Sequence, residues 1–361
     1  RMFSKAGAPN ILGMLLWGIA IGAIWRDSIP ASLWDFSPFF RSLALIVILL
    51  RAGLGINRKM LRKAGFTSVL MGFIPCIVEA AGLILAFHLL LGFSFPAAAT
   101  ASFILAAVSP AVVVPSMLNL KTLGFGEKKQ IPTMILAGAS VDDVFAFTFF
   151  TISVNILLAK QTNLLLSVLS IPYSILGGTA LGIILGFILV NIFRRATKPI
   201  RATEKLLILI AASFLLLELG HLISIAALLG TMTAGFVLYE KENQIANELS
   251  SKLSKWWVVA EILLFVLIGM NVQVNQIIRS GLIGLVIIII GLIFRSAGVF
   301  LATIGSGLNT RERLFCVIAY LPKATVQAAL GTVPLSLGIA EGPQILSIAV
   351  LAIMFTAPLG L

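Results

Sequence analysis

Long apolar runs, separated by short stretches that carry charge, proline or glycine, constrain this 361-residue sequence more than any other feature. Hydrophobic residues make up 59% of the chain and charged residues only 11%, whereas a soluble globular protein has about 25% charged residues. Such a chain has too few charged side chains to cover a surface in water, so we expect the lipid bilayer to be its solvent. The composition argues against a soluble enzyme. It predicts an all-α, multi-pass membrane protein without a separate soluble domain.

The apolar runs predict about twelve transmembrane helices, because a helix needs ~20 residues to cross the hydrocarbon core. The expected spans are approximately residues 10–25, 39–56, 66–91, 95–118, 132–158, 166–193, 204–219, 222–239, 254–270, 277–304, 313–335 and 344–361.

The basic residues give these spans an orientation. Loops that follow even-numbered spans contain 17 Lys and Arg, and loops that follow odd-numbered spans contain four, which are Arg26, Arg41, Lys160 and Arg279. Cytoplasmic loops hold the excess of Lys and Arg, so both termini are predicted to be cytoplasmic, in a protein of the cell membrane. The net charge of +12 is then mostly a topology signal. We expect membrane lipids, and no nucleic acid, as partners.

Two adjacent acids, Asp142 and Asp143, lie about ten residues into the fifth span. That depth is ~15 Å, halfway through a hydrocarbon core of ~30 Å. Neighbouring residues are separated by about 100° around a helix, so the two carboxylates do not make the same contact. Carboxylate oxygens are ligands that a hard monovalent cation prefers, and protons compete for them. We therefore predict that Asp142 and Asp143 bind Na⁺ or Li⁺, with one facing an ion cavity while the other pairs or carries a proton.

Two prolines interrupt the fourth and eleventh spans at matching depth. Pro110 follows Ser109 in the fourth span, and Pro322 precedes Lys323 in the eleventh. A proline removes a helical hydrogen bond and frees a carbonyl, which a membrane protein tolerates only where protein or a cavity satisfies it. Broken helices in corresponding halves of a chain indicate the binding site of a transporter. We expect Ser109, Ser140 and Lys323 to line that site.

The charged residues also suggest internal symmetry. Glu79, the first break and the two aspartates lie seven spans before Arg295 and the second break, and because seven is odd the two sets run in opposite directions. This is the arrangement of inverted repeats with two crossing broken helices. Glu79 and Arg295 lie at similar depth, and we predict that they form a structural ion pair, since either charge alone would be prohibitively desolvated. Lys323 is expected to neutralise one aspartate in the absence of a cation, and is a candidate proton carrier.

A buried carboxylate site that crosses the membrane only when a cation or a proton neutralises it performs antiport, and it needs no resident cofactor. A K⁺/H⁺ antiporter or a sodium-coupled organic solute symporter of similar fold shares this pattern. A cation channel also needs acids at the midplane, although channels usually repeat a symmetric filter. An intramembrane aspartyl protease is disfavoured, because adjacent acids diverge by about 100° and the sequence has no Gly-x-Gly-Asp.

Four stretches resemble the monovalent cation:proton antiporter superfamily, and within it the sodium/proton exchangers of the NHA type. They are the Asp142-Asp143 pair, Leu321 to Ala328, Ser109 to Pro115 and Arg51 to Leu54. The resemblance covers nearly the whole chain. It implies a homodimer with a six-helix ion-translocating core, a separate dimerisation domain, and elevator-like exchange of Na⁺ or Li⁺ for H⁺ at Asp142 and Asp143.

On this resemblance the single membrane domain, residues 1–361, has three parts. Core helices are expected at about 66–158 and 277–361, dimerisation or scaffold helices at about 10–56 and 204–270, and a linking helix at 166–193. One residue departs from the family pattern. Electrogenic relatives with an Asp-Asp pair usually have a lysine on the tenth span, where this chain has Arg295. Arginine does not release its proton, so Arg295 is expected to be a structural counter-charge and electroneutral exchange is favoured.

Overall fold

The structure, a computed structural model, describes residues 10–25, 28–55, 62, 65–159, 164–195, 200–223, 225–272 and 274–360. Regular structure in these ranges is helical, and they contain no strand. The α-helices are α2 (Asn10–Ile24), α3 (Ala31–Gly55), α5 (Phe66–Leu91), α6 (Phe95–Ala106), α7 (Pro110–Thr122), α8 (Ile131–Ala159), α9 (Leu164–Arg195), α10 (Ala202–Ile223), α11 (Ala227–Lys241), α12 (Asn243–Asn271), α13 (Val274–Ala302), α14 (Thr310–Ala319), α15 (Thr325–Gly331), α16 (Val333–Ser336) and α17 (Gly342–Thr356). The 3-10 helices are η2 (Glu127–Lys129) and η3 (Ala357–Gly360).

Each expected span corresponds to one helix or to one broken helix. The fourth span is divided into α6 and α7, and the eleventh into α14, α15 and α16. Among the described residues, seven helices are long and apolar enough to cross a membrane, namely α3, α5, α8, α9, α12, α13 and α17, while α2, α6 and α7 are shorter apolar helices. The prediction of an all-α, multi-pass membrane protein is confirmed, and twelve spans agree with this arrangement.

The helix ends differ most from the expected spans at α12. This helix begins at Asn243, well before the apolar run that starts near residue 254. Ala246, Leu249, Leu253 and Trp257 are all buried and recur every three or four residues. This spacing keeps one apolar face against the protein while the helix continues through polar sequence. Hydropathy detected the apolar run and missed the amphipathic extension.

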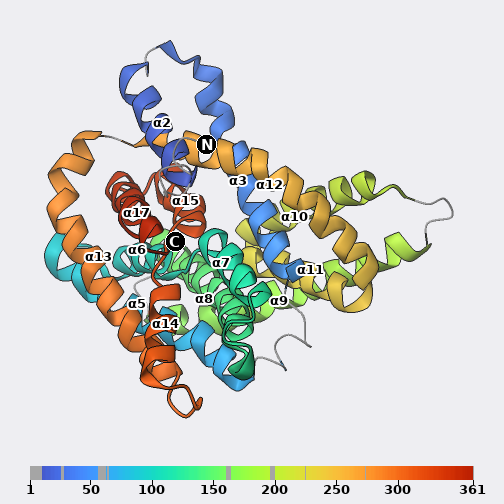
Figure 1. Cartoon of the computed structure of the whole chain (residues 1–361). Helices are drawn as coiled ribbons and strands as arrows, with labels where there is room; N and C mark the ends of the chain where they lie inside the picture. The colour runs from blue at the N-terminus through green and yellow to red at the C-terminus, as the bar shows by residue number, and fades with distance from the viewer. Residues whose placement is uncertain are drawn as a thin grey trace.

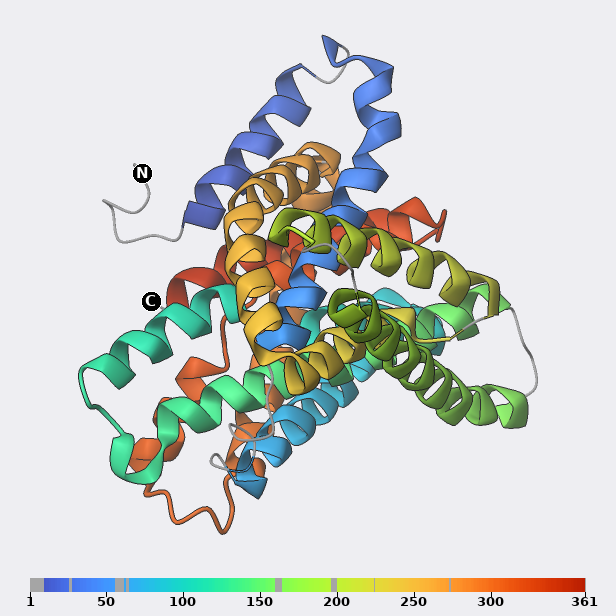
Figure 2. The ribbon, with the colours of Figure 1, turned by 90° about the vertical axis from the view of Figure 1, so that its right-hand side faces the viewer.

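The helices pack in two groups, which Figures 1 and 2 show from two sides. In one group α5 lies between α6, α8 and α13, and α13 also packs on α17. In the other, α12 packs on α2 and α3, while α11 packs on α3 and α9. In Figure 1, α5, α6, α13, α14 and α17 lie on the left and α9 to α12 on the right. The second group includes α9, which the sequence assigned to a linking helix. The division into core, scaffold and link stays a prediction.

Glycine permits the closest helix contacts in the second group. A Cβ atom added to Gly18 on α2 would collide with the backbone of Val266 on α12, and one added to Gly178 on α9 would collide with the backbone of Ala226 beside α11. Small residues let membrane helices approach until their backbones touch.

The two broken helices meet at their interruptions. Residues 107–109 join α6 to α7, and Ser109 has an extended backbone with φ −92° and ψ 109°. Residues 320–324 join α14 to α15. The backbone N–H of Ser109 donates a hydrogen bond to the carbonyl of Pro322 at 2.9 Å. Each interruption therefore satisfies part of the other's main chain.

The side of the membrane on which each loop lies stays a prediction. That prediction depends on the count of Lys and Arg in the loops. Several of these residues lie outside the described residues, namely Arg26, Arg58, Lys59, Lys63, Lys160 and Lys198.

Candidate functional site

Five charged side chains that the sequence placed at mid-membrane are buried in the first helix group. Glu79 comes from α5, Asp142 and Asp143 from α8, Arg295 from α13, and Lys323 from the segment between α14 and α15. None of them is more than 2% exposed. Buried charges require partners, so their contacts define what the site is able to do.

Arg295 lies between two carboxylates. Its Nη2 atom is 2.9 Å from Asp142 Oδ1, and its Nη1 atom is 3.3 Å from Glu79 Oε2. The Arg295–Asp142 contact is an ion pair by distance, although its angles are not those of a hydrogen bond. The sequence paired Arg295 with Glu79 alone, because helical depth does not reveal a second acid on a neighbouring helix.

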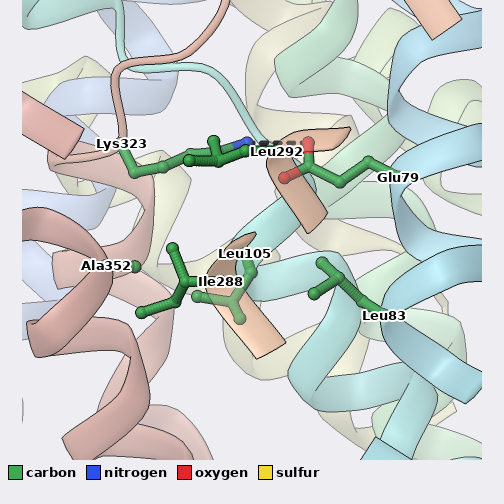
Figure 3. Close-up of a pocket in the computed structure, with 7 residues that line it drawn as sticks. All are labelled: Glu79, Leu83, Leu105, Ile288, Leu292, Lys323 and Ala352. Carbon is green, nitrogen blue, oxygen red and sulfur yellow. Dashed lines mark hydrogen bonds and ion pairs between the residues drawn. The ribbon is translucent and has the colours of Figure 1, made fainter. Parts of the chain in front are cut away.

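Lys323 also contacts Glu79. Its Nζ atom donates a hydrogen bond to Glu79 Oε2 at 2.7 Å, and Figure 3 shows the lysine reaching across from the extended segment to the carboxylate on α5. Lys323 thus meets Glu79 in this structure, where the sequence expected it to meet an aspartate. Beside the pair is a cavity of about 10 Å³, close to the space that one water molecule needs. Its lining residues are Glu79, Leu83, Leu105, Ile288, Leu292, Lys323 and Ala352.

The ends of the half-helices α6 and α7 are satisfied by these same charges. The backbone N–H of Val108 donates to Asp142 Oδ2 at 2.8 Å, and Arg295 Nη1 donates to the carbonyl of Ala106 at 2.6 Å. A helix end carries a partial positive charge at its N-terminus and a partial negative charge at its C-terminus. Asp142 therefore lies near the positive start of α7, and Arg295 lies at the negative end of α6.

Gln327 on α15 contacts the remaining carbonyls at this break. Its Nε2 atom donates to the carbonyl oxygens of Ala107 at 2.7 Å and Ile104 at 3.0 Å, with Leu105 at 3.4 Å. The last carbonyls of a helix lack partners within the helix. One amide from the second broken helix thus satisfies the interruption of the first.

Hydroxyl groups complete the crossing. The backbone N–H of Lys323 donates to Thr356 Oγ1 at 2.9 Å, and the backbone N–H of Thr325 lies 3.4 Å from Ser109 Oγ. Ser109 is therefore at the site, as expected. Ser140 donates its hydroxyl hydrogen to the carbonyl of Leu136 on its own helix, at 3.0 Å, so this structure shows it bonded within α8.

Asp143 differs from the other four charges. Both of its carboxylate oxygens are buried, and neither has a hydrogen-bond partner among the described residues. Glu79 and Asp142 are balanced by Arg295 and Lys323, whereas no described cation contacts Asp143. With all five groups ionised, the site lacks one positive charge.

Sequence reasoning gave no role to Gln327 or to Tyr320, whose ring faces Arg295. Both lie near Lys323 at the second break, and Gln327 belongs to the stretch Leu321 to Ala328 that carries the family resemblance. An uncharged polar residue or an aromatic residue in an apolar span is common. Their position within about two turns of Lys323 was the signal that could have found them.

Oppositely charged side chains buried where two broken membrane helices cross are the features expected of an ion-transport site. The chain belongs to the sodium/hydrogen exchanger family, since the description of that family's transmembrane region matches residues 1–360. This confirms the resemblance found in the sequence. The family is one of transporters.

Two relatives show the extent of the match. The chain is 34% identical over 373 residues to sodium/hydrogen exchanger 9B2 of Homo sapiens, which covers 98% of this chain and 67% of the human protein. It is 31% identical over 378 residues to sodium/hydrogen exchanger 9B1 of Macaca fascicularis, covering 98% and 71%. The chain therefore spans about two thirds of the length of these relatives.

The fold is that of a solved antiporter. The sodium proton antiporter MjNhaP1 from Methanocaldococcus jannaschii at pH 8 superposes with a TM-score of 0.78 at 19% sequence identity, covering 99% of this chain and 90% of that one. At this identity the likeness shows the fold alone, and it agrees with the expected antiporter architecture.

Proposed function

We propose that this protein exchanges Na⁺ or Li⁺ for H⁺ across the membrane by alternating access, with the cation and the proton competing for Asp142 and Asp143. The observation that carries the proposal is Asp143, a fully buried carboxylate with no partner on either oxygen among the described residues. A bare buried carboxylate is strongly unfavourable. A monovalent cation and a proton each neutralise its single negative charge. The two can therefore replace one another at this carboxylate, which is the condition for exchange.

The charge balance also supports a stoichiometry. The four paired groups leave a single negative charge on Asp143, and one Na⁺ or one H⁺ neutralises it. The site then crosses the membrane in either loaded form with the same charge. Because Arg295 holds its proton throughout, exchange of one cation for one proton, without net charge movement, fits this site.

The remaining residues have supporting roles in this proposal. Arg295 and Glu79 are a structural ion pair that also fixes Asp142. Lys323 pairs with Glu79 and is itself a candidate for proton transfer. Ser109 lines the crossing, and its hydroxyl lies 3.5 Å from that of Thr325. Ser140 joins the site only if its hydroxyl leaves the α8 carbonyl that it now contacts.

The two helix groups suggest how the site changes sides. The core helices α5 to α8 and α13 to α17 carry every charged site residue, so we propose that this group moves as an elevator against α2, α3 and α10 to α12, with α9 as the link. The scaffold group would also form a homodimer. We place the protein in the cell membrane with both termini cytoplasmic, and with no resident cofactor.

The test is cation-induced proton movement in proteoliposomes at imposed membrane potentials. We expect Na⁺ or Li⁺ to release protons from the parent protein at a rate that does not depend on the potential. Asp143→Asn should abolish this flux, because the neutral amide has no negative charge for the cation to balance and does not take up a proton. Glu248→Gln is the matched control, since Glu248 is 49% exposed on the surface and lies 3.7 Å from Lys205.

Proton flux that persists in Asp143→Asn would refute the assignment of the site. Cation flux that ignores a pH gradient would instead indicate a channel, and a response to K⁺ alone would indicate a potassium exchanger.

A further inference from the structure

Tyr320 is a buried aromatic residue whose ring faces Arg295 at the site. It follows the last residue of α14 at the second break and is completely buried. The guanidinium carbon of Arg295 lies 5.1 Å from the centroid of its ring. This is within the distance at which the face of an aromatic ring attracts a cation.

The hydroxyl end of the Tyr320 side chain packs against α8. A Cβ atom added to Gly138 would collide with the Tyr320 hydroxyl oxygen, so only glycine leaves room for it. Gly138 precedes Asp142 by four residues and shares its helix face. The tyrosine therefore lies one turn below Asp142, wedged between α8 and Arg295.

The hydroxyl group gives no evident gain in stability. It is buried and has no hydrogen-bond partner within the described part of the chain. A buried hydroxyl without a partner is unfavourable, and phenylalanine would keep the packing without that cost. Tyr320 belongs to the buried apolar cluster around Met71 and Cys316, and its contact with the charged residues is the one between its ring and Arg295.

Arg295 and the transported cation need the same carboxylate. Arg295 Nη2 lies 2.9 Å from Asp142 Oδ1, an oxygen that also belongs to the proposed cation site. A cation that binds both aspartates must compete with the guanidinium. Any group that stabilises Arg295 in its present position therefore weakens cation binding.

We propose that Tyr320 is a positioning residue that sets the cation affinity of the site by holding Arg295 on Asp142. The inference rests on the proposed exchange function. Tyr320 tunes the affinity, and Gly138, which leaves space for the Tyr320 hydroxyl, allows it to take this position. Loss of the aromatic face should let Arg295 leave Asp142 more easily and so improve cation binding.

The test compares Na⁺ KM and maximal rate in proteoliposomes for Tyr320→Leu, Tyr320→Met and Tyr320→Phe. We expect the two aliphatic variants to lower KM about fivefold, which corresponds to ~1 kcal/mol of lost cation–π attraction. Tyr320→Phe keeps the aromatic face and should shift KM less. A purely structural role would lower the amount of folded protein or its maximal rate and would not improve KM.

The matched control is Phe87→Leu. Phe87 is also completely buried, but its ring stacks on Phe93 at 5.5 Å, and in the described part of the chain no cation lies over it. It should lower thermal stability and leave KM at the parent value. Gly138→Ala tests the space that admits the tyrosine, because the added methyl group should displace the Tyr320 hydroxyl. In the parent background it should lower the KM for Na⁺. In the Tyr320→Phe background, which has no hydroxyl to displace, it should lower KM less.

An unchanged or raised KM in the folded aliphatic variants would overturn the role of Tyr320. That result is distinct from failure of the proposed function, in which the parent protein shows no Na⁺-dependent proton flux or Asp143→Asn retains it. If Tyr320→Leu does not fold, Tyr320→Met and Gly138→Ala still decide the question.

Discussion

The two helix interruptions meet at the same crossing and differ in their chemistry. The first, residues 107–109, contains no charged side chain, and its main chain is satisfied from outside by Asp142, Arg295 and Gln327. The second, residues 320–324, contains its own charge in Lys323, and its main chain is satisfied in part by a hydroxyl of α17 and in part by the backbone N–H of Ser109. The inverted repeat therefore duplicates the break but not the charges around it.

This difference bears on why the proposed ion site lies beside the first break. A break offers a cation only carbonyl dipoles, whereas a site also needs a full negative charge that nothing else neutralises. The acids that flank the first break come from α5 and α8, and the bases come from α13 and the second break. One half of the chain thus supplies the carboxylates, and the other half supplies the positive charges that balance all but one of them.

Removing the base that serves the first break should have the largest effect on stability. Arg295→Ala leaves Asp142 with the Val108 N–H but without a cation, and it removes the side-chain donor to the carbonyl of Ala106, whereas Glu79 keeps Lys323. Loss of one partner from a buried pair costs about 3–5 kcal/mol. Lys323→Ala should cost less, because Glu79 keeps Arg295. Unfolding of the purified proteins in detergent checks the order.

Glu79→Gln should recover only part of the loss in Arg295→Ala, since Asp142 still lacks its partner. Strictly additive losses in the double variant would argue against coupling between Glu79 and Arg295. Equal losses of stability in Arg295→Ala and Lys323→Ala would show that the two interruptions do not differ in how much they depend on their bases.

Gln327→Leu should have an intermediate effect. The variant removes the amide that donates to Ala107 and Ile104, and leaving buried carbonyls unsatisfied costs about 1–3 kcal/mol. The control is Ser102→Ala, in which a buried hydroxyl on α6 loses a bond to its own helix, at Ala98. The thermal unfolding temperature of Gln327→Leu should be clearly lower than that of this control. Equal unfolding temperatures would mean that the amide does not stabilise the first break.

The smallest effect is expected where the two broken helices begin. Glu312 and Asn309 form a capping box at the start of α14, and Lys129 Nζ lies 2.7 Å from Glu312 Oε2. The hydrogen bond from Lys129 holds the pKa of Glu312 below its ordinary value. A lowered pKa in the folded state means that ionised Glu312 stabilises the protein above pH ~4.3 and loses this contribution as the pH falls.

Glu312→Gln should therefore be slightly less stable than the parent at pH 7 and equally stable near pH 3, measured by thermal unfolding across that range. At the start of α6, Ser94 caps through a hydroxyl that accepts from Ala97. Ser94→Ala should lose a similar small amount at every pH, because no ionisable group takes part. A difference for Glu312→Gln that persists at pH 3 would show that its charge is not the cause.

Depth along a helix was predictable from the sequence, and position around the helix was not. Counting residues from the loops placed Glu79 and Arg295 at one level, and they lie together. The same count did not reveal whether Lys323 turns toward Glu79 or toward the aspartates, because that depends on how helices far apart in sequence pack. Proline likewise located both breaks, whereas the partners that satisfy their carbonyls, above all Gln327, depend on the crossing itself.

The distribution of charge between the two halves also affects how the protein is made. The carboxylates on α5 and α8 enter the membrane before α13 and the second break exist, because synthesis runs from the N-terminus. During that interval the nascent chain must hold unneutralised acids in or near the lipid, and it can close the crossing only when its last helices arrive. A ribosome that stops early would leave a product with exposed acids in the membrane, the kind of defect that cellular quality control is able to recognise.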